Sequence, residues 1–206
     1  MAFRDRLKSY SELHGTTFED AAKGEASMVA AKIKNYVPVK VTLLEIAGVE
    51  HSIRAMRLPK MSTGDSHYVA GGQYKLGPQD ARLVGNLIRA GADHAKAMRG
   101  IIAYLEIEMQ VGFMIEFETY RAGVECLSTS SSMHGELADL TGIALAEQKQ
   151  IDLSRKVYTR IVTISYQALR SMYRARKMHR HPDWRIFCLM IESLPCFSEL
   201  IYPEAK

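Results

Sequence analysis

Residues 152–181 read DLSRKVYTRIVTISYQALRSMYRARKMHRH, a segment without Gly or Pro. Apolar and small residues recur in it at steps of three and four, as on one face of a helix: Tyr158, Val162, Ser165, Leu169 and Met172. Asp152 can cap the start, and Pro182 follows the end. The pattern predicts one long central helix whose apolar stripe ends in Arg176 and His179.

The flanking sequence predicts shorter elements. VKVTLLEI (39–46) is rich in β-branched residues and predicts a strand, and HSIRAMR (51–57) predicts a short helix. Residues 61–78 predict a flexible loop because Gly, Ser and Asp dominate them. Further helices are expected at 79–90 and from Trp184 to Leu194, with helix, strand and helix between 93 and 121.

Composition is that of a globular protein, with 47% hydrophobic and 24% charged residues. The 206 residues are expected to form a single domain, with residues 1–38 as an N-terminal helical arm. A net charge of only +4 does not argue for nucleic acid, and it suits an anionic small molecule. Three cysteines without metal-ligand spacing and no long apolar run predict a cytoplasmic protein without a metal site or membrane span.

Two features are candidates for an anion site. Arg176 ends an apolar stripe, so its guanidinium is either presented at the mouth of a pocket or simply solvated at a helix end. Five hydroxyl residues lie between 127 and 133, followed by His134. Such a cluster suits either a helix cap or a phosphate-binding loop, in which Ser128, Ser130 and Ser131 face the anion.

The order of the segments resembles the flavin-dependent thymidylate synthases. VTLLEIAGVEHSIRAMR (41–57) is similar to the family's opening strand and helix. GADHAKAMRGIIAYLE (91–106) has the length of its Gly-His-x-Ser-x-x-Glu-His segment and the strand that follows. Gly91 and Glu106 match that pattern, whereas Ala92 and Met98 occupy the two His positions.

The later motifs are similar in part. EFETYRAGVECLSTSSSMH (116–134) stands where the family's flavin-binding motif is expected, with Arg121 and Ser131 on an Arg and a Ser of it. SYQALRSMYRAR (165–176) keeps the family's Leu-to-Arg spacing, with Ser165 in the place of an Asn. HPDWRIF (181–187), which contains Arg185, is similar to the family's Trp-containing stretch with one residue inserted.

The resemblance implies an α+β fold, helix-rich, with a small antiparallel sheet. It implies a nucleotide-binding protein that modifies a pyrimidine deoxynucleotide as a methyl- or hydroxymethyltransferase, with FAD as cofactor. The implied phosphate- and substrate-binding residues are Arg176, Arg121, Ser128, Ser130, Ser131, His134, Ser165 and Arg185.

The alternative is a non-catalytic relative that binds a nucleotide or a protein partner. The chain also resembles a group of phage-encoded proteins that share a Ser-x-Ser-x-Met-His element. Most of the flavin motif is replaced here, and Glu116 and Glu118 stand near the expected Arg positions. Because carboxylates repel a pyrophosphate, this alternative predicts weak FAD binding or none.

A homotetramer is expected, because the final helix is apolar on most sides and the resembled family is tetrameric. Light scattering should then give about four times the 23.2 kDa monomer mass. A monomer mass at micromolar concentration would contradict this prediction.

Overall fold

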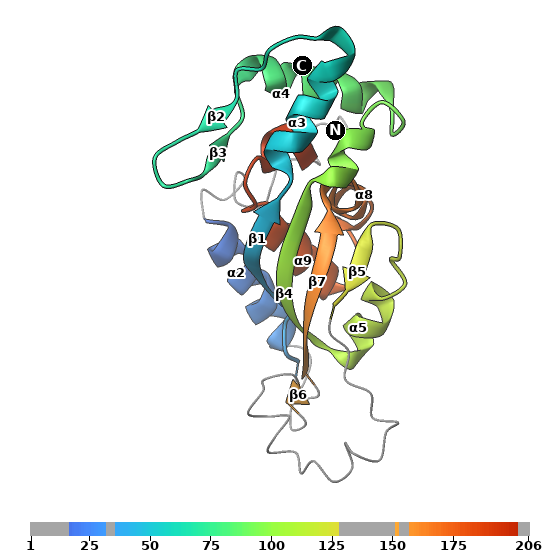
Figure 1. Ribbon diagram of the computed structural model, residues 1–206. Coiled ribbons are helices and arrows are strands. Elements are labelled where there is room, and N and C mark those ends of the chain that lie inside the picture. Colours follow the sequence, from blue (N-terminus) through green and yellow to red (C-terminus); the bar gives the residue numbers. More distant parts are fainter. Residues whose placement is uncertain (1–16, 32–35, 128–150, 153–156, 202–206) are drawn as a thin grey trace, which may run out of the picture.

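The computed structural model describes residues 17–31, 36–127, 151–152 and 157–201 (Figure 1). Its centre is an antiparallel sheet in the order β1 (Lys40–Ala47), β4 (Ile102–Gln110), β7 (Val157–Ser165) and β5 (Val124–Cys126), and β6 (Ile151–Asp152) also pairs with β7. A separate hairpin joins β2 (His67–Tyr68) to β3 (Tyr74–Lys75). The small antiparallel sheet among helices confirms the predicted α+β class.

Alternation along β4 separates the two faces of the sheet. Ala103, Leu105, Ile107 and Met109 are buried, whereas the residues between them are partly exposed. Antiparallel register places Leu105 opposite Val162 of β7, so both strands direct apolar side chains to the same face. That face, covered by helices, holds the core.

The prediction of one helix over 152–181 is wrong. Its first half forms β7, and the helix α8 (Tyr166–Arg176) begins only after the Ser165 side chain accepts a hydrogen bond from the Ala168 amide at 3.2 Å. Six of the eight residues of β7 before Ser165 are β-branched, among them the run Ile161, Val162, Thr163 and Ile164, and such residues favour a strand. Pairing with β4 on one side and β5 on the other satisfies their backbone.

Two helices lie behind the sheet in Figure 1, α2 (Phe18–Ala30) and α9 (Pro182–Ile191). Helix α9 is apolar on most sides, as predicted, and Trp184, Phe187 and Ile191 are fully buried. His181 caps it, since its ring accepts from the Asp183 amide and Pro182 opens the first turn. No helix among the described residues is long and apolar enough to cross a bilayer.

The N-terminal arm predicted at 1–38 contains α2, which packs against α9. Arg185 on α9 pairs with Glu25 on α2. The Tyr36 hydroxyl donates to Asp183 at 2.5 Å, and the Val39 amide donates to the same carboxyl at 3.1 Å. The start of β1 and helix α2 are therefore both fastened to α9.

Further helical elements form one end of the molecule: α3 (Val49–Arg57), η2 (Leu58–Lys60), α4 (Pro78–Ala90) and η3 (Lys96–Gly100). The helices expected at 51–57 and 79–90 are confirmed. Between 93 and 121 the first expected helix is only the short η3, and β4 and α5 (Val111–Phe117) follow it. A π-helical turn, η4 (Phe197–Ile201), buries Leu200 and Ile201.

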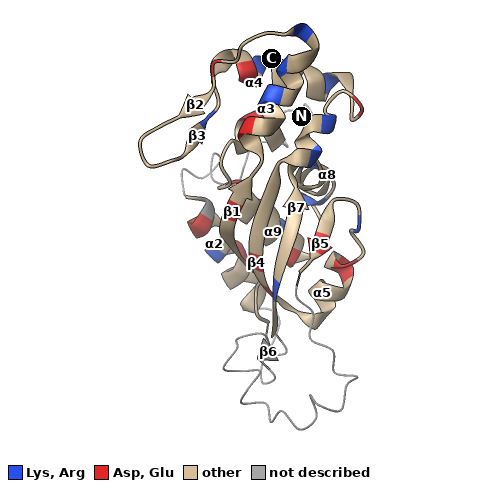
Figure 2. Ribbon diagram, in the orientation of Figure 1, with Lys and Arg blue, Asp and Glu red and all other residues tan. Residues whose placement is uncertain are grey.

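Lys and Arg are concentrated toward this end (Figure 2). Residues 48–100 hold eight Lys and Arg against four Asp and Glu, so they carry a surplus equal to the net charge of the whole chain. The middle of the sheet is more acidic on its less covered face, where Glu106 and Glu108 project from β4. The charge is thus unevenly distributed along the molecule.

The segment predicted to be a flexible loop, 61–78, is fastened to the fully buried carboxylate of Asp80. Asp80 accepts hydrogen bonds from Arg57 Nε at 2.6 Å, from the Asp65 amide at 3.0 Å, and from the amide and hydroxyl of Ser66 at 3.0 and 2.6 Å. Burial alone would raise the pKa of Asp80, but the bonds from Ser66 and Arg57 outweigh it and lower that pKa. Flexibility of the segment stays a prediction.

We expect Asp80→Asn to lower the free energy of unfolding by about 3 kcal/mol at pH 7, because it leaves Arg57 without its charged partner. Urea denaturation measures this, with the exposed Asp93→Asn as control. Because the pKa of Asp80 is lower in the folded state, the stabilisation is present above about pH 4 and is lost as the pH falls through the folded pKa. A difference between the wild type and Asp80→Asn that does not change from pH 7 to pH 2 would contradict this assignment.

Candidate functional site

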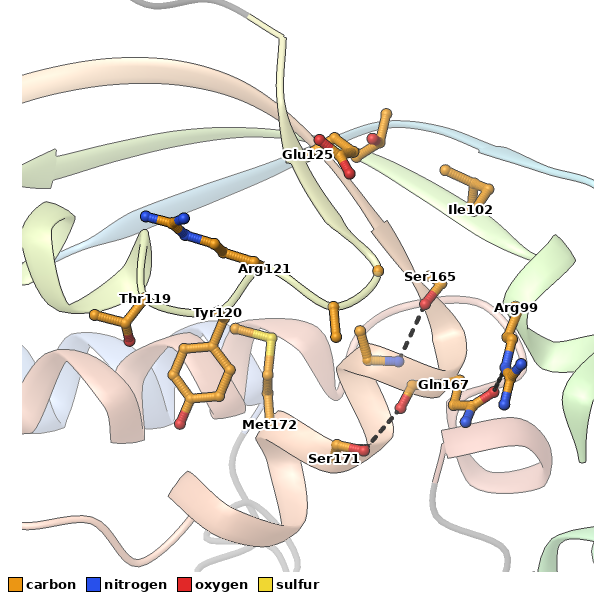
Figure 3. Close-up of a pocket in the computed structure, with 14 residues that line it drawn as sticks. Arg99, Ile102, Thr119, Tyr120, Arg121, Glu125, Ser165, Gln167, Ser171 and Met172 are labelled. Atoms are coloured by element: carbon orange, nitrogen blue, oxygen red, sulfur yellow. Dashed lines mark hydrogen bonds between the residues drawn. The ribbon is translucent and has the colours of Figure 1, made fainter. Parts of the chain in front are cut away.

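A cavity lies where the segment before β5 approaches the start of α8 (Figure 3). Its volume is about 810 Å³. It is lined by Arg99, Ile102, Thr119, Tyr120, Arg121, Ala122, Gly123, Glu125, Thr163, Ser165, Gln167, Ala168, Ser171 and Met172. Arg99 and Arg121 lie at opposite sides of the view, and Arg99 Nε donates to the Gln167 side chain at 2.9 Å. We call this the first cavity.

Gly123 allows two segments that line the first cavity to pack closely against each other. Its φ is +76°, which favours glycine, and an added Cβ would come within 2.5 Å of the Ser165 hydroxyl. The Ser165 amide donates to the Gly123 carbonyl at 2.9 Å. The start of α8 and the segment before β5 are therefore in direct backbone contact.

The second cavity has a volume of about 420 Å³. It is lined by Met109, Phe117, Glu118, Tyr120, Arg121, Val124, Glu125, Cys126, Arg160 and Val162. Tyr120, Arg121 and Glu125 line both cavities. The two cavities are therefore neighbours that share a wall.

Arg160 is a buried cation in this second cavity. It projects from β7 on the helix-covered face, opposite Ile107, and is 4% exposed. One guanidinium nitrogen, Nη1, donates to the Thr159 carbonyl at 3.0 Å, and the group lies 5.3 Å from the centre of the Tyr158 ring. Its Nε is buried without a hydrogen-bond partner, and no described carboxylate forms an ion pair with it. Such an arrangement costs free energy unless an anion completes it.

Arg121, predicted to bind phosphate, is exposed and lines both cavities. No hydrogen bond or ion pair joins it to another described residue. Together with Arg160 it places two guanidiniums on the second cavity, where Glu118 and Glu125 are the acidic residues. The cavity thus has the donors that a phosphate or carboxylate requires.

Arg176 lies one helical turn beyond Met172, but it is not among the residues that line either cavity. Its Nε donates to the Tyr120 hydroxyl, and its Nη2 lies 3.9 Å from Glu116. The guanidinium carbon is 5.3 Å from the ring centres of both Tyr120 and Trp184. Its predicted contact with phosphate stays a prediction.

The other predicted site residues fall in three places. Ser165 caps α8 and lines the first cavity. Arg185 pairs with Glu25 and donates to the His179 carbonyl at 2.7 Å, so it joins α9 to α2. Ser128, Ser130, Ser131 and His134 lie outside the described residues. Among the described residues, no group of three or more His, Cys, Asp and Glu is arranged to hold a metal ion.

Arg99, Tyr120 and Arg160 were not predicted. Interpreted as a strand, residues 157–165 place Arg160 on the same face as Val162 and Ile164, and a cation within such a buried series is the signal that was available. The helical interpretation put it at an angle away from the apolar stripe. Arg99 and Tyr120 lie in segments that carry no comparable pattern.

This fold, a small antiparallel sheet with helices behind it, matches that of solved flavin-dependent thymidylate synthases. A solved structure of ThyX from Helicobacter pylori, complexed with FAD and dUMP, matches over 80% of this chain and 98% of that chain. The TM-score is 0.50 at 13% sequence identity. A second structure of ThyX from the same organism, also with FAD and dUMP, covers 80% and 97%, with a TM-score of 0.54 at 12% identity.

No protein-family model matches the sequence, and no curated protein is significantly similar to it. The likeness to ThyX is therefore one of fold.

We expect Arg160→Met to raise the free energy of unfolding by about 1–2 kcal/mol in the absence of ligand, because it removes a buried donor without a partner. Urea denaturation measures the change, and the exposed Arg54→Met is the matched control. A loss of stability in Arg160→Met would mean that the guanidinium is satisfied within the protein.

Proposed function

We propose that this protein binds a deoxynucleoside monophosphate, with the phosphate held by Arg160 and Arg121 in the second cavity. The observation that carries the proposal is the buried guanidinium of Arg160, whose Nε lacks a partner and which lines an open cavity. Planar guanidiniums suit bidentate recognition of phosphate. The fold of the chain, which it shares with structures holding dUMP, supports a nucleotide as the ligand.

FAD in the first cavity is the second part of the proposal. Two guanidiniums, Arg99 and Arg121, line that cavity against one carboxylate, Glu125, so the charge balance suits a pyrophosphate. The Glu116 carboxylate accepts from Trp184 Nε1 at 2.7 Å and lines neither cavity, so the repulsion expected from it is reduced. Arg99 and Arg121 would hold the pyrophosphate, and FAD when bound supplies hydride transfer.

The finer function we propose is modification of the pyrimidine of that nucleotide, as a methyl- or hydroxymethyltransferase. The two neighbouring cavities support it, since a reaction between two bound molecules needs them side by side. A cytoplasmic homotetramer, with residues 128–134 completing the phosphate site, belongs to the same proposal. The second candidate is a non-catalytic phage-encoded protein that kept the fold and binds a nucleotide or a protein partner, which the replacement of most of the flavin motif favours.

We expect calorimetry to detect binding of dUMP to the wild type and an affinity about ten- to a hundred-fold lower for Arg160→Met, as expected for loss of a charge-assisted contact. Arg54→Met should bind as the wild type does. Inorganic phosphate should compete with dUMP. Equal affinities for the wild type and Arg160→Met would remove the second cavity from the proposal.

Retention of FAD separates the two candidates. A synthase-like enzyme should bind FAD and show flavin absorbance after gel filtration, and Arg99→Met should weaken that binding. The non-catalytic candidate predicts dUMP binding without FAD.

A further inference from the structure

The wall between the two cavities contains one aromatic side chain, Tyr120, whose position depends on residues outside both cavities. Tyr120 lies three residues after the end of α5 and is partly buried. Its ring lies edge-on to Trp184, with the ring centres 5.2 Å apart, and its hydroxyl accepts from Arg176 Nε. In Figure 3 the Tyr120 and Arg121 side chains extend in different directions from adjacent backbone positions, and because the two residues are consecutive, a shift of the backbone at Tyr120 also moves Arg121.

Arg176 has its charge balanced within the chain. Its Nε is used by Tyr120, its Nη2 lies 3.9 Å from Glu116, and the same Glu116 oxygen accepts from Trp184 Nε1 at 2.7 Å. The guanidinium also lies near the faces of two aromatic rings, a favourable contact for a cation. Contact with a phosphate in either cavity would require Arg176 to leave several of these partners at once.

Trp184 fixes the other side of this cluster. It is fully buried and packs on Phe113 and Phe117, with ring centres 4.9 and 6.0 Å away. The Trp184 ring that Arg176 contacts is therefore part of the core, whereas Tyr120 lies at the edge of the core. Phe117 lines the second cavity alone, and of the cluster only Tyr120 lines both cavities.

We propose that Arg176 is a positioning residue, which acts on ligand binding by holding Tyr120, and through it Arg121, at the shared wall. The inference rests on the proposed function, because Arg176 itself touches no ligand in this arrangement. Loss of the Arg176–Tyr120 contact lets the wall move into the cavities, so the binding of the nucleotide weakens whether or not it carries a phosphate.

The experiment compares two ligands, dUMP and deoxyuridine, which lacks the phosphate. Arg176→Lys keeps the positive charge but loses the Nε donor and the planar stack, and Tyr120→Phe keeps the ring but loses the acceptor. Each should weaken both ligands by a similar factor, about ten-fold for one charge-assisted contact. The double variant should be no weaker than Arg176→Lys alone, since both changes break the same contact. Arg174→Lys, exposed on the same helix, is the control.

A direct contact between Arg176 and phosphate gives a different result. The Arg176 variant would then weaken dUMP but leave deoxyuridine unchanged, and Tyr120→Phe would leave both unchanged. Either result overturns the positioning role.

Trp184 is the only tryptophan in the chain, so its fluorescence reports on the cluster without a ligand. We expect Arg176→Lys to change its emission and to increase its quenching by acrylamide, while Arg174→Lys does neither. If the wild type binds neither ligand, the proposed function fails. An unchanged Trp184 signal in Arg176→Lys would then overturn the positioning role as well, and a changed signal would uphold the contact that it requires.

Discussion

Antiparallel pairing between β4 and β7 determines where every other part of the candidate site lies. Nine residue pairs join the two strands, from Ile102 opposite Ser165 to Gln110 opposite Val157. This register turns Arg160 to the helix-covered face and ends β7 at Ser165, which becomes the cap of α8. A slip of one residue would send Arg160 to the opposite face and move the helix start away from Gly123.

Asp80 and Arg160 are both buried charges, but they differ in how many partners they have within the chain. Asp80 receives four hydrogen bonds and has an ion-pair partner in Arg57, so its charge is compensated within the chain. Arg160 is almost as deeply buried, but Nη1 has only a backbone carbonyl and Nε has no partner. The hydrogen bonds to Asp80 attach residues 65–66 to the rest of the fold. In contrast, the Arg160 guanidinium keeps an unpartnered N–H at the second cavity.

Sequence patterns predicted the elements whose signals are local. The β-branched run in β1 and Pro78 at the start of α4 are such signals. Interpretation of 152–181 was wrong because Val162, Leu169 and Met172 satisfy a helical period even though a strand ends between them at Ser165. Only long-range pairing with β4 and β5 decides between helix and strand there. The second cavity depends on that pairing, so Arg160 had no sequence signal as long as its segment was interpreted as a helix.

Helix α2 is synthesised before α9, the helix against which it packs. Its Glu25 pairs with Arg185, 160 residues further along, and the nearby Tyr36 bonds to Asp183, 147 residues further. Ribosomes add about 5–20 residues per second, so α2 emerges on the order of 10 s before α9. During that interval Ala21 and Ala22, which the finished fold buries, have no α9 beside them. Helix α2 of the nascent chain therefore cannot pack in its final place until α9 has been synthesised.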